Sequence, residues 1–575
     1  MVSVLDRKLR RDLRASAVLL LAITSIIAVG VACLVSMGSA YNNLDEARRR
    51  YYVQCRMADF SIELKKVPLA ELASLAAMPG VTEIRPRIQF FATVDLPHVV
   101  KPLNGLVLSL PDRPKPIIND IVLKQGGYFT DTRENEVIVN EAFALEHGLH
   151  PGQWIRLVLN NRRQELFIVG TAISSEFVYL LGPGAIMPDP ESFGVFYLKQ
   201  GYAEDVFDFN GAANQVIGRL APELRDRPGV LLRQAEDLLA PYGVFSTTPL
   251  ADQASNKYVT LEIAGLASFA TVMPCIFLAV AALVLNVLLS RMADQQRTII
   301  GTLKALGYSK VQVFMHFLKM GLSVGIAGGL LGCGLGYLFA EGLTITYRQY
   351  FEFPELNNHF YPGLHTAGLS VSVVCAVIGS LRGTWSVLKL SPAEAMRPKP
   401  PKQGGAVLLE RVTWFWRRLS SSWRMVLRGV IRSRLRTAAG VFAAAMGAGV
   451  LVSGFMMADA IVYLVDFQFK WILRSDVDLT FKDEQGEDAL LEAARLPGVD
   501  RAEPRLNVGC TFINGPHRKK GGITGLAPGA QLTVPRDRQG RAIRVPTAGL
   551  AMSRKLAEIL HLQRGDVVDF KPVKG

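Results

Sequence analysis

Long uncharged apolar runs constrain this chain more than any other feature of its sequence. A helix needs about 20 predominantly apolar residues to cross the hydrocarbon core of a bilayer. Five runs are long enough, at residues 15–44, 263–290, 320–340, 360–381 and 437–458. The sequence therefore predicts a multi-pass α-helical membrane protein.

Composition agrees with this prediction. The chain has 575 residues, 50% of them hydrophobic, which is too apolar for an ordinary soluble protein and too long for one domain. Its net charge of +14 would suit a protein that binds nucleic acid. The basic residues cluster beside the apolar runs, however, as they do in the cytoplasmic segments of membrane proteins. We expect no nucleic-acid partner. The six cysteines have neither the spacing of a disulfide framework nor that of a zinc site, so we also expect no metal.

Positive charge predicts the topology, because cytoplasmic segments of membrane proteins are rich in Lys and Arg. Residues 1–14, 291–319 and 382–436 are rich in basic side chains, whereas the loop 341–359 has three glutamates against one arginine. We expect the first three on the cytoplasmic side of a cell inner membrane and the loop outside. A cleaved signal peptide is the competing interpretation of the first run. That run exceeds the about 7–15 apolar residues of a signal peptide, and an uncleaved helix is favoured.

Residues 45–257 have a different texture. Short β-prone runs such as 136–139 alternate with Pro/Gly turns and with helical stretches such as 69–78. This pattern predicts a mixed α+β domain large enough for its own core. If the first helix runs outward, this domain is extracytoplasmic.

A charged amphipathic segment lies between the second and third runs. Its apolar positions follow one helical stripe, at Ile299, Ile300, Leu303 and Leu306. Positive charge surrounds the stripe, from Arg297, Lys304 and Lys310. Gly307 stands where a left-handed helix end favours glycine, so the helix is expected to stop there. By periodicity alone, a solvated helix that merely ties two spans together explains the pattern equally well.

Ile300 to Gly307, Ile-Gly-Thr-Leu-Lys-Ala-Leu-Gly, resembles the I-G-x-L-[RK]-A-L-G signature of FtsX/MacB-like permeases, which are subunits of mechanotransmission-type ABC systems. Ser391 to Arg397 resembles the P-x-E-A-[LM]-R tail that closes the four-helix permease unit of that family. The resemblance implies an FtsX-like permease domain at 258–397 and a MacB-like periplasmic core at 45–257. Many members have a carboxylate before the Ile-Gly pair, where this chain has Ile299.

The resemblance also implies a partner. In this family the segment docks on a separate cytoplasmic ABC ATPase, which binds the ATP. Carried over to this chain, the docking residues are Arg297, Ile300, Gly301, Leu303, Lys304, Ala305, Leu306 and Gly307. The chain itself has no phosphate-binding loop of the G-x-x-x-x-G-K-[ST] type, so no cofactor and no enzymatic activity are expected in it.

The third run is rich in glycine. Gly321, Gly325 and Gly329 follow at spacings of four residues, which allows close helix packing in lipid. The simpler alternative is that glycine is merely tolerated in spanning helices.

The chain begins again near residue 423. A basic lead-in, the run 437–458 and a polar region 459–575 repeat the order of the first half, with matches such as Pro79-Gly-Val with Pro497-Gly-Val and Gly152 with Gly565. This predicts an internal duplication of a unit with one span, an outer domain and three further spans. The second copy is incomplete. Either the product is truncated, or, for equal copies, a protein of about 800 residues with eight spans is expected.

Two functions remain open at this point. The first is a permease that exports or extracts a lipoprotein, lipid, peptide or hydrophobic compound, with two permease units per assembly and a periplasmic adaptor as a further partner. The second is a transmembrane regulator that activates a cell-wall hydrolase or reports a ligand. The size of the outer domain favours the first.

Overall fold

The structure is a computed structural model, and it describes residues 4–97, 99, 101–185, 187–388, 391, 393, 396, 416, 418–432, 434–481 and 485–572. Five of its helices are long and apolar enough to cross a membrane, at Ala17–Gln54, Ala254–Gln295, Lys310–Tyr350, Pro362–Leu381 and Gly440–Ile472. Each overlaps one predicted run. The predicted multi-pass helical fold is confirmed.

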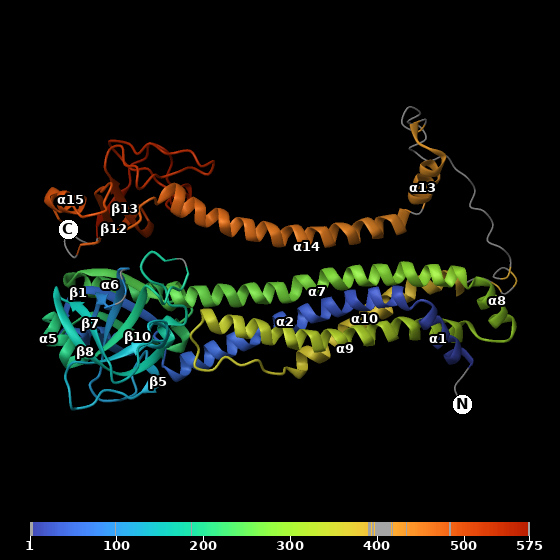
Figure 1. Cartoon of the computed structure of the whole chain (residues 1–575), viewed down its shortest axis with the longest axis horizontal. Coiled ribbons are helices and arrows are strands. Elements are labelled where there is room, and N and C mark those ends of the chain that lie inside the picture. The colour runs from blue at the N-terminus through green and yellow to red at the C-terminus, as the bar shows by residue number, and fades with distance from the viewer. Residues whose placement is uncertain are drawn as a thin grey trace.

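A bundle of long helices forms the body of the first half (Figure 1). Its members are α1 (Val4–Ala15), α2 (Ala17–Gln54), α7 (Ala254–Gln295), α8 (Arg297–Ala305), α9 (Lys310–Tyr350) and α10 (Pro362–Leu388). Apolar side chains of α2, α7, α9 and α10 meet in one core, which includes Ile27, Val31, Leu285, Val324 and Ala376. At one end the bundle meets a β-rich domain, and α8 lies at the opposite end (Figure 1).

Four of these helices, α2, α7, α9 and α10, are longer than the runs that predicted them. At 1.5 Å per residue, α2 extends about 57 Å and α7 about 63 Å, roughly twice a bilayer core. The predicted boundaries at 44 and 263 fall inside continuous helices. Charge ends an apolar run without ending a helix, since Asp45 pairs with Arg48 and Arg49 along the same helix. The helices therefore continue from the apolar region into the β-rich domain.

The first α+β domain (residues 55–253) contains a seven-stranded mixed sheet in the order β5-β8-β6-β9-β4-β3-β7, with a further pairing of β7 with β8 that closes six of the strands into a ring. The strands are β3 (Gln89–Asp95), β4 (Leu103–Leu110), β5 (Ile121–Gly126), β6 (Glu136–Asn140), β7 (Trp154–Leu159), β8 (Arg162–Ser174) and β9 (Phe193–Lys199). The central strands are buried on both faces, as in β9, where all seven residues are buried. Two short helices, α4 (Glu141–Glu146) and α5 (Gln200–Phe207), accompany this sheet.

A second, antiparallel sheet in the order β11-β1-β10-β2 completes the domain. Its strands are β1 (Phe60–Pro68), β2 (Val81–Arg87), β10 (Ala212–Leu220) and β11 (Val244–Pro249). The helices α3 (Leu72–Ala76) and α6 (Gly229–Leu239) bury Leu75, Leu232 and Ala235 against Phe60 and Ile62 of β1. Short 3-10 turns connect these elements at Leu69–Glu71, Ser175–Phe177, Pro222–Leu224, Ala240–Tyr242 and Leu250–Asp252. The predicted α+β composition of this region is confirmed.

The second half is described in part. It contains α13 (Ser421–Arg432), α14 (Arg434–Asp466), which lies alongside α7 (Figure 1), a π-helical turn (Phe467–Ile472), α15 (Glu487–Ala494), α16 (Arg554–Ile559) and a sheet of β12 (Arg505–Asn514), β13 (His517–Leu526) and β14 (Asp569–Pro572). The predicted tail motif at 391–397 and most of the linker 382–436 lie outside the described residues or have no described side chains.

Local backbone conformation is alike in the two halves at the positions that the predicted repeat pairs. Gly80 and Gly498 have φ of +96° and +88°, and Gly152 and Gly565 have φ of +94° and +102°. Helices α4 and α16 each begin with a side-chain cap, at Asn140 and Ser553. These likenesses agree with a duplication, which stays a prediction.

Candidate coupling site

The segment that resembles the family signature forms a sharp elbow, which we call the coupling elbow (residues 296–309). Helix α8 ends in a left-handed glycine, Gly307, with φ of +91°. Its amide donates to the carbonyl of Lys304 at 3.2 Å, and the amide of Tyr308 donates to that of Leu303 at 3.1 Å. This pair of hydrogen bonds is a Schellman motif, which satisfies the last carbonyls of α8.

The next helix begins at once. The Ser309 hydroxyl accepts from the Gln312 amide at 3.2 Å, and the Ser309 amide donates to Oε1 of Gln312 at 2.8 Å. This is a capping box, so the helix end at Gly307 and the helix start at Lys310 are fixed within a few residues. The turn between α8 and α9 therefore has little conformational freedom.

One face of α8 packs against both of its neighbours. The Ile300 side chain is 2% exposed and contacts a small cluster with Ala293 of α7 and with Val313 and Phe317 of α9. Gly301 beside it is also buried. A displacement of α8 must therefore displace the ends of α7 and α9 as well.

The other face of α8 is open. Ile299 is 49% and Leu306 72% exposed, and Thr302 and Ala305 between them are exposed too. The sequence predicts one apolar stripe containing Ile299, Ile300, Leu303 and Leu306, whereas the structure divides it. Neighbouring residues of a helix point about 100° apart, so only Ile300 can face the bundle while Ile299 and Leu306 face away.

Of the predicted basic residues on this helix, Arg297 and Lys304 are partly exposed. Burial lowers the pKa of Lys304, and the nearby Lys310 lowers it further. Arg297 and Lys304 are three and four residues from Ile300, so these two basic residues lie on the packed side of α8, and the open face is mainly apolar.

The N-terminal helix α1 also reaches the elbow. Nζ of Lys8 donates to Oε1 of Gln296, the residue before α8, at 2.5 Å. Asp12 pairs with Lys8 and lies 3.1 Å from Nε2 of His316 on α9. A second pair, Asp6 with Lys319 at 2.8 Å, joins the same two helices. Sequence reasoning missed these contacts. The available signal in the sequence was the presence of two carboxylates, Asp6 and Asp12, in an otherwise basic segment.

Helix α9 carries the predicted glycines Gly321, Gly325 and Gly329, and all three face α10. A Cβ added at Gly325 would lie 2.6 Å from Cβ of Ala376 and 3.1 Å from the carbonyl of Ser372. The corresponding neighbours of Gly321 and Gly329 are also α10 residues. These positions have no room for a side chain, so the two helices approach closely here.

A second glycine ridge, at Gly328, Gly332 and Gly336, faces α2. A Cβ at Gly332 would lie 2.6 Å from Cβ of Val31 and 2.7 Å from the carbonyl of Ala28. The sequence contains this spacing, but spacing alone does not say which neighbour each ridge meets. Helix α9 is therefore packed closely between α2 and α10.

Near the α+β domain, Asn43 of α2 holds several elements together. Its amide group donates to Thr344 of α9 at 3.3 Å and to Asn358 of the following loop at 3.0 Å. Its carbonyl oxygen accepts from the His359 amide at 3.2 Å and from the Tyr361 hydroxyl at 3.0 Å. A buried asparagine with this many partners fixes the loop to α2.

The loop from Phe351 to Tyr361 contacts the first α+β domain directly. The Glu352 amide donates to the Val178 carbonyl at 2.8 Å, and the Asn140 side chain donates to the Glu352 carboxylate at 2.8 Å. Burial raises the pKa of Glu352 to about 8, against the opposing effect of the Asn140 hydrogen bond. Phe351 and Phe353 are buried beside Tyr51 of α2, so the loop is seated on both bundle and domain.

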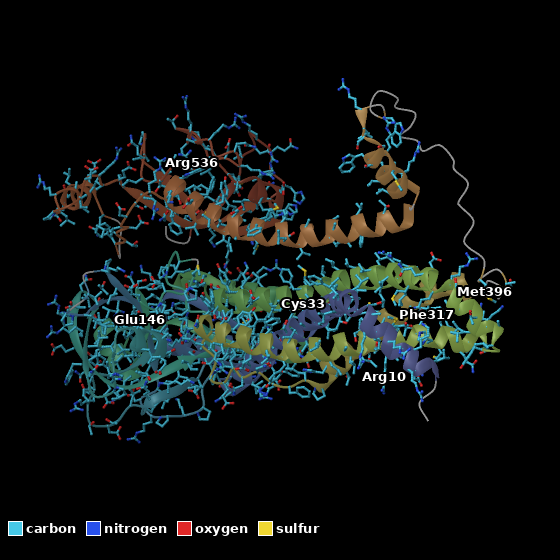
Figure 2. All side chains as sticks on the ribbon, turned by 45° about the vertical axis from the view of Figure 1, so that its right-hand side comes forward. Arg10, Cys33, Glu146, Phe317, Met396 and Arg536 are labelled. Carbon is cyan, nitrogen blue, oxygen red and sulfur yellow. The ribbon has the colours of Figure 1, made fainter. Side chains whose placement is uncertain are left out.

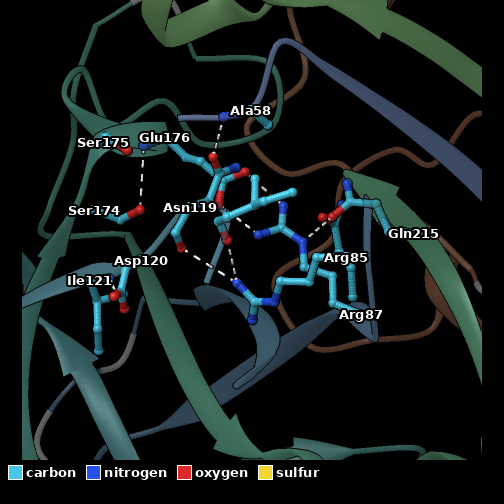
Figure 3. A network of polar contacts seen from close by, with 12 residues as sticks. Ala58, Arg85, Arg87, Asn119, Asp120, Ile121, Ser174, Ser175, Glu176 and Gln215 are labelled. Carbon is cyan, nitrogen blue, oxygen red and sulfur yellow. Dashed lines mark hydrogen bonds and ion pairs between the residues drawn. The ribbon is translucent and has the colours of Figure 1, made fainter. Parts of the chain in front are cut away.

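Within the domain, a buried polar network joins the two sheets (Figure 3). Arg87 of β2 makes two hydrogen bonds with the Glu176 carboxylate, at 2.6 and 2.7 Å, and a third with Gln215 of β10. Arg85 donates to the carbonyls of Ile118 and Ser109 at 2.7 and 2.8 Å. Burial, together with the nearby positive charge of Arg87, lowers the pKa of Arg85 to about 10. Glu176 lies in the 3-10 turn after β8, and its backbone carbonyl accepts from the side chain of Gln253, the residue before α7, at 3.4 Å, so the network reaches the start of the long helix.

The described residues include no group of three or more His, Cys, Asp or Glu side chains arranged to hold a metal ion. His147 lies 2.9 Å from the carbonyl of Glu191, which is a surface contact within the domain.

Comparison with known proteins gives the following relatives. Residues 271–392 match the family FtsX-like permease C-terminal. No curated protein matches the chain in sequence. Several solved structures resemble the chain in part, and three of them are described here. The periplasmic region of MacB from Actinobacillus actinomycetemcomitans is 10% identical over 36% of this chain and 92% of its own, with a TM-score of 0.23.

The extracellular domain of the noncanonic ABC-type transporter YknZ from Gram-positive bacteria is 14% identical over 31% of this chain and 93% of its own, with a TM-score of 0.21. A domain of a putative permease protein from Porphyromonas gingivalis is 14% identical over 36% and 97%, with a TM-score of 0.22.

The matched range 271–392 covers part of α7, the whole coupling elbow, α9 and α10. It includes the glycine ridges and every residue of the signature segment. Residues 271–392 of this chain thus form an FtsX-like permease C-terminal domain.

Proposed function

We propose that the chain is the permease subunit that couples ATP hydrolysis by a separate cytoplasmic ATPase to movement of its α+β domains. One observation carries this proposal. The helices that hold α8, namely α7 and α9, run without interruption from the coupling elbow to the first α+β domain.

The contacts at each end suit transmission of motion. At the elbow, the Schellman motif and the capping box fix the turn between α8 and α9 by hydrogen bonds. At the far end, α7 starts directly after β11, and the loop after α9 is hydrogen-bonded to the domain through Glu352. A push on α8 would therefore shift whole helices rather than bend a loop.

The open face of α8 is the proposed docking surface for the ATPase. Exposed apolar side chains such as Ile299 and Leu306 suit the apolar core of a protein interface. ATP would be bound by that partner, and no cofactor is proposed for this chain. The elbow and N-terminus would lie in the cytoplasm, and the α+β domains would lie outside an inner membrane.

The proposed work is export or extraction of a lipoprotein, lipid, peptide or hydrophobic compound, with a periplasmic adaptor as a further partner. Two permease units per assembly would come from the duplication or from a dimer. The first α+β domain is large and is held to the helices by hydrogen bonds and buried side chains. Both features support a domain that moves with the helices and acts on the substrate.

Co-purification of the full chain with its ATPase tests the proposal. Leu306→Asp places a charge in the open face, and we expect it to weaken the complex by roughly tenfold or more, as for a central interface residue. Gly301 is unsuitable for this test because it is buried. The control is Leu145→Asp, which changes a similarly exposed leucine in the α+β domain.

Loss of the ATPase with Leu306→Asp, but not with Leu145→Asp, is the expected result. If the ATPase is retained equally by both variants, α8 is not the docking site. If it does not associate with the wild type, the permease role itself fails.

A further inference from the structure

Helix α1 has two different faces. Leu9 and Leu13 pack on the bundle core, and Lys8 and Asp12 contact the elbow and α9. The opposite face is a stripe of exposed arginines, which we call the arginine stripe: Arg7, Arg10, Arg11 and Arg14. Among the described residues, no carboxylate pairs with any of the four. Figure 2 labels Arg10 at the end of the bundle where α1 lies.

A single residue separates α1 from the membrane-spanning helix α2. Ser16 has φ of −109° and ψ of 16°, outside the helical range, and its amide donates to the Asp12 carbonyl at 3.1 Å, so the chain turns there. Val18 is 86% and Leu21 64% exposed at the start of α2, where exposed apolar side chains contact lipid. Arg14 is only four residues before Val18. The arginine stripe therefore directly precedes the lipid-exposed start of the apolar region of α2.

We propose that the arginine stripe binds the anionic headgroups of membrane phospholipids and so holds α1 against the coupling elbow. Four exposed guanidinium groups on one helical face complement phosphate, and guanidinium matches phosphate oxygens in geometry. An acidic protein surface would offer similar charge, but the position of the stripe directly before the lipid-exposed Val18 and Leu21 favours lipid.

The other face of α1 carries the effect to the coupling site. Lys8 contacts Gln296 at the start of α8, and Asp12 contacts His316 in the first turns of α9. Lipid that fixes α1 thus also restrains the elbow. The lipid contact goes beyond the proposed transport function and needs no ATPase.

The test uses the full chain in nanodiscs of phosphatidylcholine with added phosphatidylglycerol. A fluorophore is attached at Ala15→Cys, and the exposed native Cys275 is changed to Ser. Quenching of this fluorophore by headgroup-spin-labelled phosphatidylglycerol or phosphatidylcholine measures how much of each lipid lies beside α1. We expect a clear preference for phosphatidylglycerol beside α1. Arg10→Gln/Arg14→Gln should reduce that preference by about fivefold for each arginine, given the usual strength of a basic residue at an anionic surface.

Two controls separate the causes. Arg10→Lys/Arg14→Lys keeps the charge and should keep most of the preference. Arg162→Gln/Arg227→Gln removes the same net charge from exposed positions of the α+β domain and should leave the preference unchanged. An unchanged preference in Arg10→Gln/Arg14→Gln overturns the proposal. If that variant instead loses only the ATPase in co-purification, the arginine stripe is a protein contact and the proposal is also overturned.

The link to the elbow has its own measurement. A spin label at the exposed Thr302→Cys of α8 should be less mobile with phosphatidylglycerol than with phosphatidylcholine alone. The glutamine variant should abolish that difference. Equal mobility in both lipids for the wild type would refute a restraint of the elbow by lipid.

Discussion

At the scale of single residues, buried polar side chains fix the first α+β domain to the helices. The side chains of Arg87 and Glu176 are 4% and 6% exposed. Both carboxylate oxygens of Glu176 accept hydrogen bonds from the two terminal guanidinium nitrogens of Arg87. Such a pair contributes little net stability when intact, but the loss of one partner leaves an uncompensated buried charge.

The first prediction follows from this pair. Glu176→Ala should lower the free energy of unfolding by about 3–5 kcal/mol, because the guanidinium of Arg87 is left without its carboxylate. Chemical denaturation of the full chain in detergent measures the change. Glu191→Ala removes a partner of Lys101 from an exposed ion pair and should change the stability far less, because solvent screens that pair. Equal effects of the two variants would contradict the assigned role of the network.

Glu352 gives a prediction about pH. Its pKa is raised from 4.5 to about 8 in the folded protein, mainly by burial. Between these values the folded protein holds a proton that the unfolded chain has lost. The free energy of unfolding should therefore fall as pH rises through this range and level off above it.

Glu352→Gln removes this titration, so its stability relative to the wild type should increase from about pH 5 to about pH 8. Thermal unfolding at a series of pH values measures the effect. Glu355→Gln changes an exposed glutamate of the same loop and should follow the wild type. Parallel curves for Glu352→Gln and the wild type would show that the carboxyl group is not titrating in the buried contact.

At the scale of elements, the two glycine ridges decide how closely the helices pack. Gly332→Ala should destabilise the bundle by about 1–3 kcal/mol, because the added methyl meets Val31 and the Ala28 carbonyl. Gly334→Ala on the same helix meets nothing within 4 Å and should be neutral or stabilising by up to about 1 kcal/mol, since alanine favours helix. Thermal unfolding of the two variants in detergent tests this. A greater loss with Gly334→Ala would contradict the packing described for α9.

Sequence patterns predicted the element types well and their limits less well. Hydrophobic runs predicted all five long helices, since a span must be apolar throughout. The boundaries at 44 and 263 differed because helices such as α2 continue through charged residues that pair along the helix. The end of α8 at Gly307 was predictable because a left-handed cap has a residue signature.

The predicted coupling residues illustrate the remaining difficulty. Periodicity places Ile299 and Ile300 in one apolar stripe, but only the positions of α7 and α9 determine which of them is buried. Asn43 and the contacts of α1 join residues about 300 positions apart, as in Asn43 with Thr344 and Asp12 with His316. No local pattern in one sequence encodes such pairs.

At the scale of the whole molecule, the proposed function follows one mechanical route. It begins at the open face of α8, follows α7 and α9, and reaches the two sheets of the first α+β domain through the loop at Glu352 and the network at Glu176. Each junction on the route is closed by buried side chains or by paired hydrogen bonds. Relative movement of the α+β domains is therefore the expected output of a change at the coupling elbow.

The most direct test of that claim is a distance measurement between two spin labels, at Glu146→Cys in the first α+β domain and Arg495→Cys in the second region, both exposed, in a chain with Cys275→Ser. The chain is assembled with its ATPase and measured by pulsed electron resonance without nucleotide and with a non-hydrolysable ATP analogue. We expect nucleotide to shift the distance distribution, and we expect Leu306→Asp to abolish that shift. An identical distribution in both states, with the ATPase bound, would contradict transmission from the elbow and leave the chain a static membrane anchor.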